Sequence, residues 1–503
     1  MKRDIFWIVT DEHRVDGIGA YGNHWIKTPN LDRLASNGVL FERAYCQSPA
    51  CVASRASFLS GMYPSTTENM WFDPTRSSLK FFPEILQENG YHTVNVGKEH
   101  HNRERSPFNE SFLKEAPKEG WPGSLSAEFI KREKELNILK RKSTFKKLIV
   151  GGTNPLPANE AECANRVHRS IQYLENYQQN PSPILFRLSL LYPHTPVIPP
   201  EPFDTLYDAS LMEYPSDSVK SKGVIDFEKK VYQQISGTKG MTRSEIMHMR
   251  KSYYGLCSYV DEEIGNFINY LENNWQRPYL IVFHSDHGNL LGEHDLNEKF
   301  NMYEPSRQVP LIIQGHNIPR GKRIKPFTEL VDIAPTLLEY TGIKSVEKME
   351  GKSLIPLMNH PSIRWRDYAF TEHRIFTPHD LFQHPALQDY VLTEIEGKRG
   401  YDVVSLAKII EDQNLDWYKL EGTPYKWWGP IFQCIRTDRY AMNVRPIWKE
   451  GQGKDFMGTL YDLEIDPHET NNLFKSKKYE TIKNQMLLLL KNHFKQNSTG
   501  DRK

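Results

Sequence analysis

Short apolar runs alternate with amphipathic stretches through the first two thirds of the chain, and this alternation restricts the fold more than any other feature. The run DIFWIV (residues 4–9) has the length and composition of a strand buried on both faces, and the polar residues TDEH follow it. Apolar residues at helical spacing predict a long helix over residues 243–274, and TPNLDRLASNG (residues 28–38) predicts a shorter one that Gly38 ends. Strands that alternate with helices predict a mostly parallel sheet with helices on both faces.

The chain contains further segments of both kinds. The other predicted strands are YHTVNVG (91–97), PILFRLSLLYPH (183–194), YLIVFHSDHG (279–288) and VPLIIQG (309–315). After about Lys352 the chain turns to short strand-like pieces rich in Trp and Tyr, such as FQCIRTDRYAMNV (432–444) and GTLYDLEIDP (458–467), before a closing helix. We therefore predict a large α/β domain over residues 1–360 and a smaller α+β domain over residues 361–503.

Composition excludes several classes of protein. The 503 residues carry a net charge of +1, which gives no electrostatic footprint for nucleic acid, and no run approaches the ~20 apolar residues of a membrane span. The five cysteines are widely spaced and contain no CxxC pair, which argues against a disulfide framework. We expect neither a nucleic-acid nor a membrane partner. The N-terminus lacks the apolar core of a signal peptide, so we expect a cytoplasmic protein, or a periplasmic one if the N-terminus was trimmed.

Acidic side chains follow two of the predicted strands. Asp11 and Glu12 leave the first strand, and Asp286 leaves a later one with His287 beside it. The carboxyl ends of strands in such a sheet open into one crevice, where massed carboxylates repel one another unless a cation neutralises them. Three carboxylates with one histidine favour Ca²⁺ or Mg²⁺. The alternative is that both stretches are strand-to-loop turns with solvated acids.

Cationic side chains lie at the ends of two further predicted strands and at other places in the chain. The candidates to face an anion are Arg55, Lys98, His100, His194 and Lys299. Arg55 lies at the start of a predicted helix, SRASFLSG, whose N-terminus itself favours negative charge. A metal with Arg and Lys stabilises a tetrahedral oxyanion such as sulfate or phosphate. Each candidate taken alone is more often a surface charge or a core histidine, and that is the interpretation for His92, His101 and His294.

Taken together, these motifs resemble those of the sulfatases of the alkaline-phosphatase-like superfamily, especially their bacterial branch. The matching stretches span nearly the whole chain in the family's order: VTDEHR, TPNLDRLASNGVLFERAYCQSPACVASRASFLSGMYP, GYHTVNVGKEH, LYPHTP, HSDHGNLLGEHDLNEKFNMYEPSRQVPLII, ELVDIAPTLLEYTGI and LYDLEIDPHETNNL. The Cys-x-x-x-Arg and Ser-Asp-His-Gly stretches are the specific ones. The resemblance implies a large mixed, mostly parallel sheet sandwiched by helices, with a smaller C-terminal α+β domain that contributes to the substrate pocket.

The resemblance also implies a mechanism. Cys51 would be converted to formylglycine (3-oxoalanine) by a formylglycine-generating maturation enzyme, and one hydroxyl of the hydrated aldehyde would attack sulfur while the other later eliminates sulfate. The divalent cation, usually Ca²⁺ with Mg²⁺ as the alternative, would be held by Asp11, Glu12, Asp286, His287 and the modified Cys51. Arg55 and Lys98 would steady the formylglycine, and His100 would be the base that breaks down the sulfated intermediate. His194 and Lys299 would bind the sulfate and assist departure of the alcohol.

Three positions depart from the family's usual pattern. Ala53 stands where proline is usual, Glu12 stands where aspartate is usual or glutamine in a phosphonate-ester-cleaving branch, and His287 replaces a common asparagine. The leading hypothesis is hydrolysis of a sulfate ester. The alternative is a phosphonate monoester or phosphodiester hydrolase on the same scaffold. A non-catalytic binding protein is disfavoured because every expected charged position is filled.

An aromatic tract suggests the substrate class. The stretch WYKLEGTPYKWWGPIF contains Trp417, Trp427 and Trp428, whose faces suit stacking on sugar rings, although tryptophans at an interface between domains would look the same. We expect a sulfated saccharide, such as a polysaccharide fragment, with a small alkyl or choline-type sulfate as the alternative.

Overall fold

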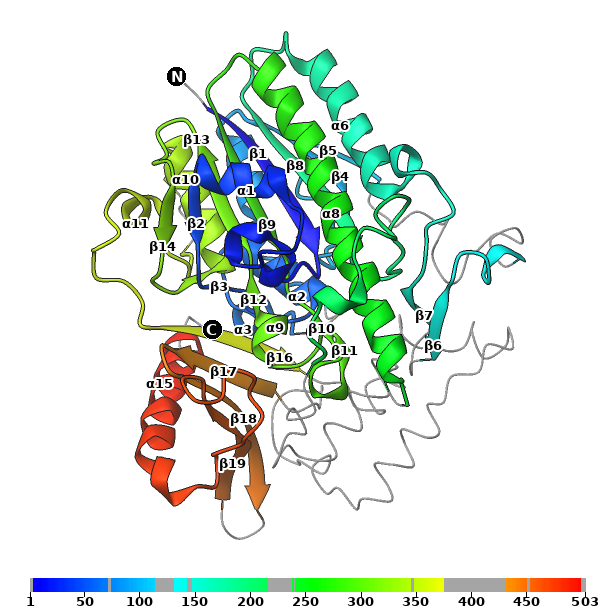
Figure 1. Ribbon diagram of the computed structural model, residues 1–503. Coiled ribbons are helices and arrows are strands. Elements are labelled where there is room, and N and C mark those ends of the chain that lie inside the picture. Colours follow the sequence, from blue (N-terminus) through cyan, green and yellow to red (C-terminus); the bar gives the residue numbers. More distant parts are fainter. Residues whose placement is uncertain are drawn as a thin grey trace.

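A computed structural model describes residues 3–70, 74–113, 131–142, 147–215, 238, 240–344, 348–374, 431–449 and 453–498. In these residues an eight-stranded sheet lies between two layers of helices, and a four-stranded antiparallel sheet lies at one end of the molecule (Figure 1). The aromatic tract with Trp417, Trp427 and Trp428 lies outside the described residues.

The central sheet has the mixed, mostly parallel character that the sequence predicts. Its strands, in order across the sheet, are β14 (Lys322–Ile324), β2 (Val39–Phe41), β13 (Leu311–Gly315), β9 (Tyr279–Ser285), β1 (Asp4–Asp11), β8 (Ile184–Pro193), β4 (His92–Gly97) and β5 (Glu110–Phe112). The five strands from β9 to β5 are parallel, whereas β13 runs antiparallel to both of its neighbours.

One predicted strand is divided in two. Residues 308–309 form β12 (Gln308–Val309), which pairs with β3 (Ala44–Tyr45), whereas β13 begins after Pro310 and joins the central sheet. Proline has no N–H to donate to a ladder, so the strand changes partners at that residue. A third short strand, β15 (Thr328–Glu329), completes the small sheet with β3.

Both faces of the central sheet are buried, and β1 shows why its sequence is apolar throughout. Phe6 and Ile8 belong to one core, and Ile5, Trp7 and Val9 belong to the other, as the two-residue period of a strand requires. Helices α1 (Pro29–Ser36), α6 (Glu162–Tyr177) and α8 (Arg243–Asn274) cover the first face (Figure 1). Helices α2 (Cys51–Ser60), α4 (Phe82–Glu88), α10 (Ile333–Thr341) and α11 (Ile355–Asn359) cover the second.

Helix α2 begins earlier than the sequence suggests. The predicted helix starts at Ser54, but the helix contains Cys51 as its first residue, after an extended Ala50 (φ −130°, ψ 126°). Ala50, the N-cap residue, makes no side-chain capping hydrogen bond to the first turn of α2. Cys51 therefore lies at the positive end of the helix dipole.

The C-terminal region has the predicted α+β composition. Strands β16 (Tyr368–Arg374), β17 (Ile431–Thr437), β18 (Tyr440–Lys449) and β19 (Gly453–Asp462) form its sheet, and α15 (Glu480–Ser498) packs against it. Strand β16 runs beside the segment that leads into α2, because Thr371 Oγ1 donates to the Cys46 carbonyl and Glu372 N donates to the Gln47 carbonyl. A domain boundary near residue 360 stays a prediction.

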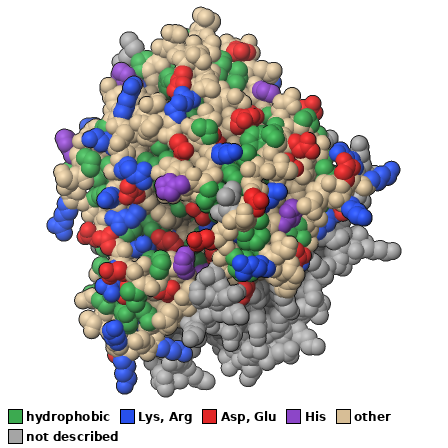
Figure 2. Space-filling view, in the orientation of Figure 1, with side chains coloured by type: hydrophobic (Ala, Val, Ile, Leu, Met, Phe, Trp, Pro, Cys, Tyr) green, Lys and Arg blue, Asp and Glu red, His purple; other side chains and the backbone are tan. Residues whose placement is uncertain are grey.

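The remaining described elements are short or peripheral. They are β6 (Leu139–Lys142), β7 (Lys147–Gly151), β10 (Leu290–Leu291), β11 (Asn297–Glu298), α3 (Pro64–Thr67) and α9 (Glu304–Arg307). Across the described part of the chain, no helix combines the length and apolar character needed to cross a bilayer. Acidic and basic side chains are interspersed over the face shown in Figure 2, in keeping with the small net charge.

Candidate active site

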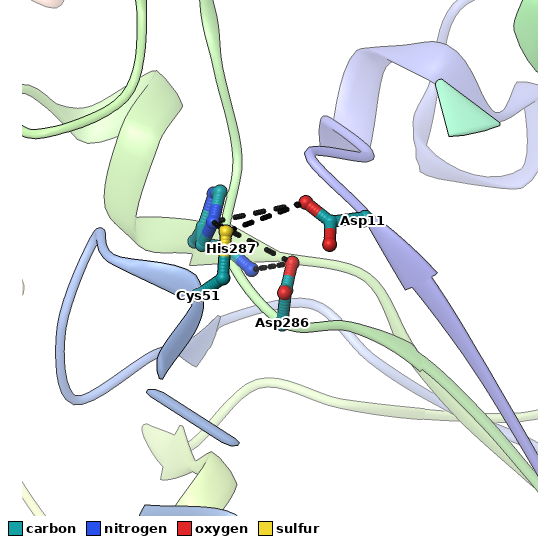
Figure 3. Close-up of side chains that lie close together, drawn as sticks. All are labelled: Asp11, Cys51, Asp286 and His287. Carbon is teal, nitrogen blue, oxygen red and sulfur yellow. Dashed lines mark hydrogen bonds and ion pairs between the residues drawn. The ribbon is translucent and has the colours of Figure 1, made fainter. Parts of the chain in front are cut away.

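Four side chains predicted to hold a metal meet at the carboxyl edge of the central sheet. Asp11 ends β1, Cys51 begins α2, and Asp286 and His287 follow β9. One potential ligand atom from each lies within 4.8 Å of the others, and the four point toward one another (Figure 3). Strands β1 and β9 are parallel neighbours, so the chain delivers Asp11 and Asp286 side by side. All four residues are buried.

The His287 ring directs its Nε2 at this cluster. Its Nδ1 lies 2.9 Å from the Gly288 carbonyl, which can only accept, so Nδ1 carries the proton. Its Nε2 faces Cys51 Sγ at 3.2 Å. Burial lowers the pKa of His287, but the charges of Asp286 and Cys51 outweigh it and raise the pKa to about 9.

Glu12 occupies a different place from the other predicted ligands. It groups with Asp11 and His194, with its Oε1 paired to Lys299 Nζ and 3.3 Å from His194 Nε2. Its other oxygen, Oε2, is buried without a hydrogen-bond partner among the described residues. Burial raises the pKa of Glu12 to about 7 against the attraction of Lys299. A buried carboxylate oxygen with no partner, beside two further carboxylates, fits a hard divalent cation.

Arg55 joins the acids to one another. Its Nη2 lies 3.0 Å from Asp11 Oδ2 and its Nε lies 2.9 Å from Asp286 Oδ2, with all three side chains fully buried. Lys98 Nζ contacts the same Asp11 oxygen. Burial alone would raise the pKa of Asp11, but Lys98, His194 and Arg55 together hold it well below its usual range. Asp11 is therefore anionic at neutral pH.

The Cys51 sulfur lies among polar groups. Lys299 Nζ is 3.2 Å from Sγ, Asp11 Oδ1 is 3.7 Å from it, and His100 hydrogen-bonds to it. Burial lowers the pKa of His100 to about 4, and the contact with Cys51 opposes that shift only in part. Groups that donate to Sγ here would donate equally to an oxygen at the same position. With Lys299 and His100 in contact with residue 51, the site has the groups to hold an anion there beside a cation.

Comparison with known proteins identifies the family. The sulfatase family model matches residues 3–343. The chain belongs to the sulfatase family. An arylsulfatase from Clostridium perfringens is 31% identical over 406 residues, which cover 74% of this chain and 82% of that protein. An N-acetylglucosamine-6-O-sulfatase from Bacteroides thetaiotaomicron is 25% identical over 564 residues, covering 99% of this chain and 88% of that protein.

The same comparisons confirm the predicted fold. The crystal structure of a phosphonate monoester hydrolase from Agrobacterium radiobacter matches with a TM-score of 0.74 at 20% identity, covering 99% of this chain and 96% of that one. At this identity the likeness concerns the alkaline-phosphatase-like architecture alone. The family match makes this sulfatase a sulfuric ester hydrolase.

Four residues around the site of the sulfatase have left-handed backbone conformations that side chains other than glycine rarely adopt. They are Glu12 (φ 63°), His100 (φ 44°), Glu298 (φ 65°) and Phe300 (φ 75°). The N–H of Phe300 donates to the Pro49 carbonyl at 3.1 Å, just before Cys51 in the chain. Strained backbone persists where the surroundings over-determine it, which is common at functional sites.

All ten predicted residues lie in this sulfatase site, but two contacts were missed by the sequence analysis. Ser189 Oγ accepts from Arg55 Nη1 at 3.0 Å, and Ser54 Oγ donates to the Asp286 carbonyl at 2.6 Å. A signal for Ser189 existed. Arg187 and Ser189 are polar at alternate positions of an otherwise apolar strand, which indicates a polar patch on one face.

Proposed function

We propose that this sulfatase removes sulfate from a sulfated saccharide, such as a polysaccharide fragment, by using a formylglycine made from Cys51 and a divalent cation. The observation that carries the proposal is the setting of Cys51 Sγ, which lies at the start of α2 between Lys299 and the cluster of Asp11, Asp286 and His287. The saccharide is supported by one of the relatives that match nearly the whole chain, an N-acetylglucosamine-6-O-sulfatase.

The side chains around residue 51 have distinct tasks in this proposal. Once converted by a maturation enzyme, residue 51 supplies a hydrated aldehyde whose hydroxyl is the nucleophile toward sulfur. Arg55 and Lys98 fix the orientation of Asp11 and so of residue 51. His100, in contact with residue 51, takes the proton whose loss releases sulfate. Lys299, in contact with residue 51, and His194, in contact with Glu12, bind the sulfate oxygens and assist departure of the alcohol.

A divalent cation completes the charge balance. Asp11, Asp286, His287 and Glu12, whose Oε2 has no hydrogen-bond partner in the described part of the chain, supply a set of donors rich in oxygen, for which Ca²⁺ or Mg²⁺ is the match. When bound, such an ion neutralises the carboxylates and polarises the sulfate ester.

Reaction rates on matched substrates test the proposal. The purified protein is assayed on an aryl sulfate and an aryl phosphonate monoester, and then on a panel of defined sulfated sugars. We expect faster turnover of the sulfate and release of sulfate from at least one sugar. Faster turnover of the phosphonate would favour the alternative activity, and activity confined to choline-type or alkyl sulfates would overturn the saccharide assignment.

Two cysteine variants control the assay. Cys51→Ala should abolish turnover, because it removes the residue that becomes the nucleophile. Cys46→Ala should retain it, because Cys46 is an equally buried thiol that packs in the apolar core and whose sulfur donates to the Ser306 carbonyl. Equal activity in both variants would contradict a nucleophile at residue 51.

A further inference from the structure

A polar row crosses the central sheet behind the active site. In the register of the strands, Trp7 of β1 lies opposite Arg187 of β8, Arg187 lies opposite Asn95 of β4, and Asn95 lies opposite Ser111 of β5. Residues opposed in this way share one face of the sheet. Here it is the face that α2 and α4 cover, since Trp7 packs on Phe58 and Phe82. The apolar layer thus contains a continuous line of hydrogen-bonding groups.

Arg187 is the charged member of this row. It is fully buried, and its guanidinium lies over the rings of Trp7 (5.3 Å) and Phe108 (4.6 Å). Within the described ranges it forms no ion pair, and its Nη1 has no hydrogen-bond partner. Burial, followed by repulsion from Arg55, lowers the pKa of Arg187 to about 9, and Glu99 opposes the shift. A buried cation without a direct counter-ion is costly, so an apolar residue here would be the more stable choice.

The hydrogen bonds of Arg187 lead to the segment that carries Lys98 and His100. Its Nε donates to Asn95 Oδ1 at 2.7 Å, and its Nη2 donates to the Lys98 carbonyl at 3.3 Å. The same carbonyl accepts from Arg55 Nη1 at 3.0 Å. One backbone oxygen is therefore shared by an arginine of the site and an arginine behind it.

Glu99 lies between Lys98 and His100 in the chain, and its side chain contacts the polar row rather than the site. Glu99 accepts from Ser111 Oγ and, at 2.7 Å, from Ser106 Oγ, and it pairs with His101 Nε2 at 3.1 Å. Against the effect of burial, the hydrogen bonds from His101 and Ser111 lower the pKa of Glu99 to about 2. Asn95 Nδ2 closes the row by donating to Ser111 Oγ at 2.9 Å and to the Gly97 carbonyl at 2.8 Å.

We propose that Arg187 is a positioning residue, which holds the backbone of residues 97–101 so that Lys98 reaches Asp11 and His100 reaches residue 51. Arg187 and Glu99 work as one unit. Arg187 fixes the Lys98 carbonyl, and the hydrogen bonds of Glu99 hold its side chain in the polar row, away from the site. This inference rests on the proposed function, in which Lys98 and His100 act on residue 51. It assigns a role in catalysis to a side chain that touches neither substrate nor cation.

Steady-state kinetics of Arg187→Met test the proposal. The variant keeps the bulk of the side chain and loses its donors. Because a misplacement of about 1 Å can cost ~10²-fold in rate, we expect kcat on an aryl sulfate to fall by about 10- to 100-fold while KM changes by less than about threefold. Arg187→Lys, which retains a donor and the charge, should recover part of the loss. All rates are expressed per molecule that contains formylglycine, so that impaired maturation is not counted as slow chemistry.

Two further variants separate positioning from general destabilisation. Arg307→Met removes an arginine that is equally buried but pairs with Glu304 and Glu469, away from residues 97–101, and it should leave kcat unchanged per folded molecule. Glu99→Gln should lower kcat by itself, and the double variant with Arg187→Met should fall little below the worse single variant, because both act through one segment.

The outcomes are distinct. An unchanged kcat in Arg187→Met would overturn the positioning role. So would a double variant whose fold-loss in kcat equals the product of the two single fold-losses. Should Arg187→Met not fold, Ser111→Ala takes its place: it removes one hydroxyl of the row from a partly exposed strand, and an unchanged kcat would likewise overturn the proposal. A wild-type protein inactive on every sulfate ester would instead refute the proposed function and would be seen before any variant is made.

Discussion

At the scale of single residues, the site is a balance of buried charges that is incomplete without a cation. Asp11, Glu12 and Asp286 converge beside the cationic groups of Arg55, Lys98, Lys299 and His194, and Glu12 keeps one oxygen without a hydrogen-bond partner among the described residues. Repulsion between these carboxylates should destabilise the free protein, and a divalent ion should relieve it. Cation binding and folding stability are therefore coupled.

Removal of the metal should show this coupling. Chelation should lower both activity and the unfolding temperature, and added Ca²⁺ should restore them, with about 2.7 kcal/mol of stabilisation at 100 times the dissociation constant. Asp286→Asn should abolish the Ca²⁺-dependent shift in a thermal unfolding experiment. Asp208→Asn, at an exposed carboxylate, should retain it. A full shift in Asp286→Asn would remove Asp286 from the set of ligands.

The sequence indicated the members of the site but not all of their contacts. Seven of the ten predicted residues follow predicted strands, whereas Cys51, Arg55 and Lys299 came from the family resemblance and the predicted helix, and the structure places all ten close together. The side-chain direction of Glu12 was not predictable, because it depends on a left-handed backbone at residue 12 and on Lys299 and His194, which are distant in the sequence. The local sequence pattern does not reveal partners that are distant in the sequence.

At the scale of elements, the end of β4 is the most constrained turn near the site. Gly97 has φ +105°, and a Cβ there would lie 1.9 Å from the Ser189 carbonyl oxygen. Gly97→Ala should therefore destabilise the protein by more than the ~1 kcal/mol of backbone strain alone and should displace Lys98. Gly22→Ala is the matched control, since Gly22 has φ +107° with nothing within 4 Å of its Cβ position. Equal unfolding free energies in urea for the two variants would contradict this account.

Strand β16 buries a carboxyl whose ionisation should weaken the fold. Glu372 accepts from Ser65 Oγ through one oxygen, and its other oxygen has no partner among the described residues. Burial raises the pKa of Glu372 to about 8, although the contact with Ser65 opposes the shift. A raised carboxyl pKa stabilises the fold fully below the unfolded pKa near 4.5, and that contribution is lost as pH rises through 8.

Glu372→Gln tests that sign. The variant and the wild type should be equally stable near pH 4, and the variant should become the more stable one as pH rises to 9, by at least ~1.4 kcal/mol, the equivalent of one pKa unit. The measurement is the unfolding temperature across that pH range. Glu464→Gln, at an exposed side chain, should follow the wild type at every pH. An unchanged difference across the range would show that Glu372 ionises normally.

The sequence predicted the types of the secondary-structure elements more accurately than their boundaries. Buried strands and amphipathic helices fall where periodicity places them. Pro310 and Cys51 mark the exceptions, because the change of partner at β12 and the early start of α2 depend on tertiary neighbours.

At the scale of the whole molecule, a buried ion-pair network attaches the C-terminal sheet to the region that bears the site. Glu469 Oε2 accepts from Glu304 N at 2.7 Å, and its Oε1 lies 3.6 Å from Arg307 Nη2. Arg436 Nε pairs with Glu304 Oε1 at 3.0 Å. This network lies beside the segment that leads to Cys51, because Cys46 N donates to the Arg307 carbonyl. The network should therefore stabilise the docking of the C-terminal sheet against the rest of the molecule.

Removal of the Glu469 side chain should lower the free energy of unfolding. Glu469→Ala leaves Arg307 short of a buried counter-charge, which typically costs about 3–5 kcal/mol. Lys80→Met is the control: it removes a surface pair with Glu88, for which ~0–1 kcal/mol is usual. Unfolding by urea measures both. Equal losses would mean that the network contributes no more than a surface ion pair.

The central claim is that residue 51 acts as a formylglycine, and peptide mass spectrometry of an active preparation tests it most directly. The peptide that contains residue 51 should have lost one sulfur and two hydrogens and gained one oxygen relative to the encoded cysteine, in proportion to the activity of the sample. Ala53 stands where the family usually has proline, so the fraction of molecules converted also shows how well this sequence is recognised for maturation. A fully active protein whose peptide carries only unmodified Cys51 would contradict the account.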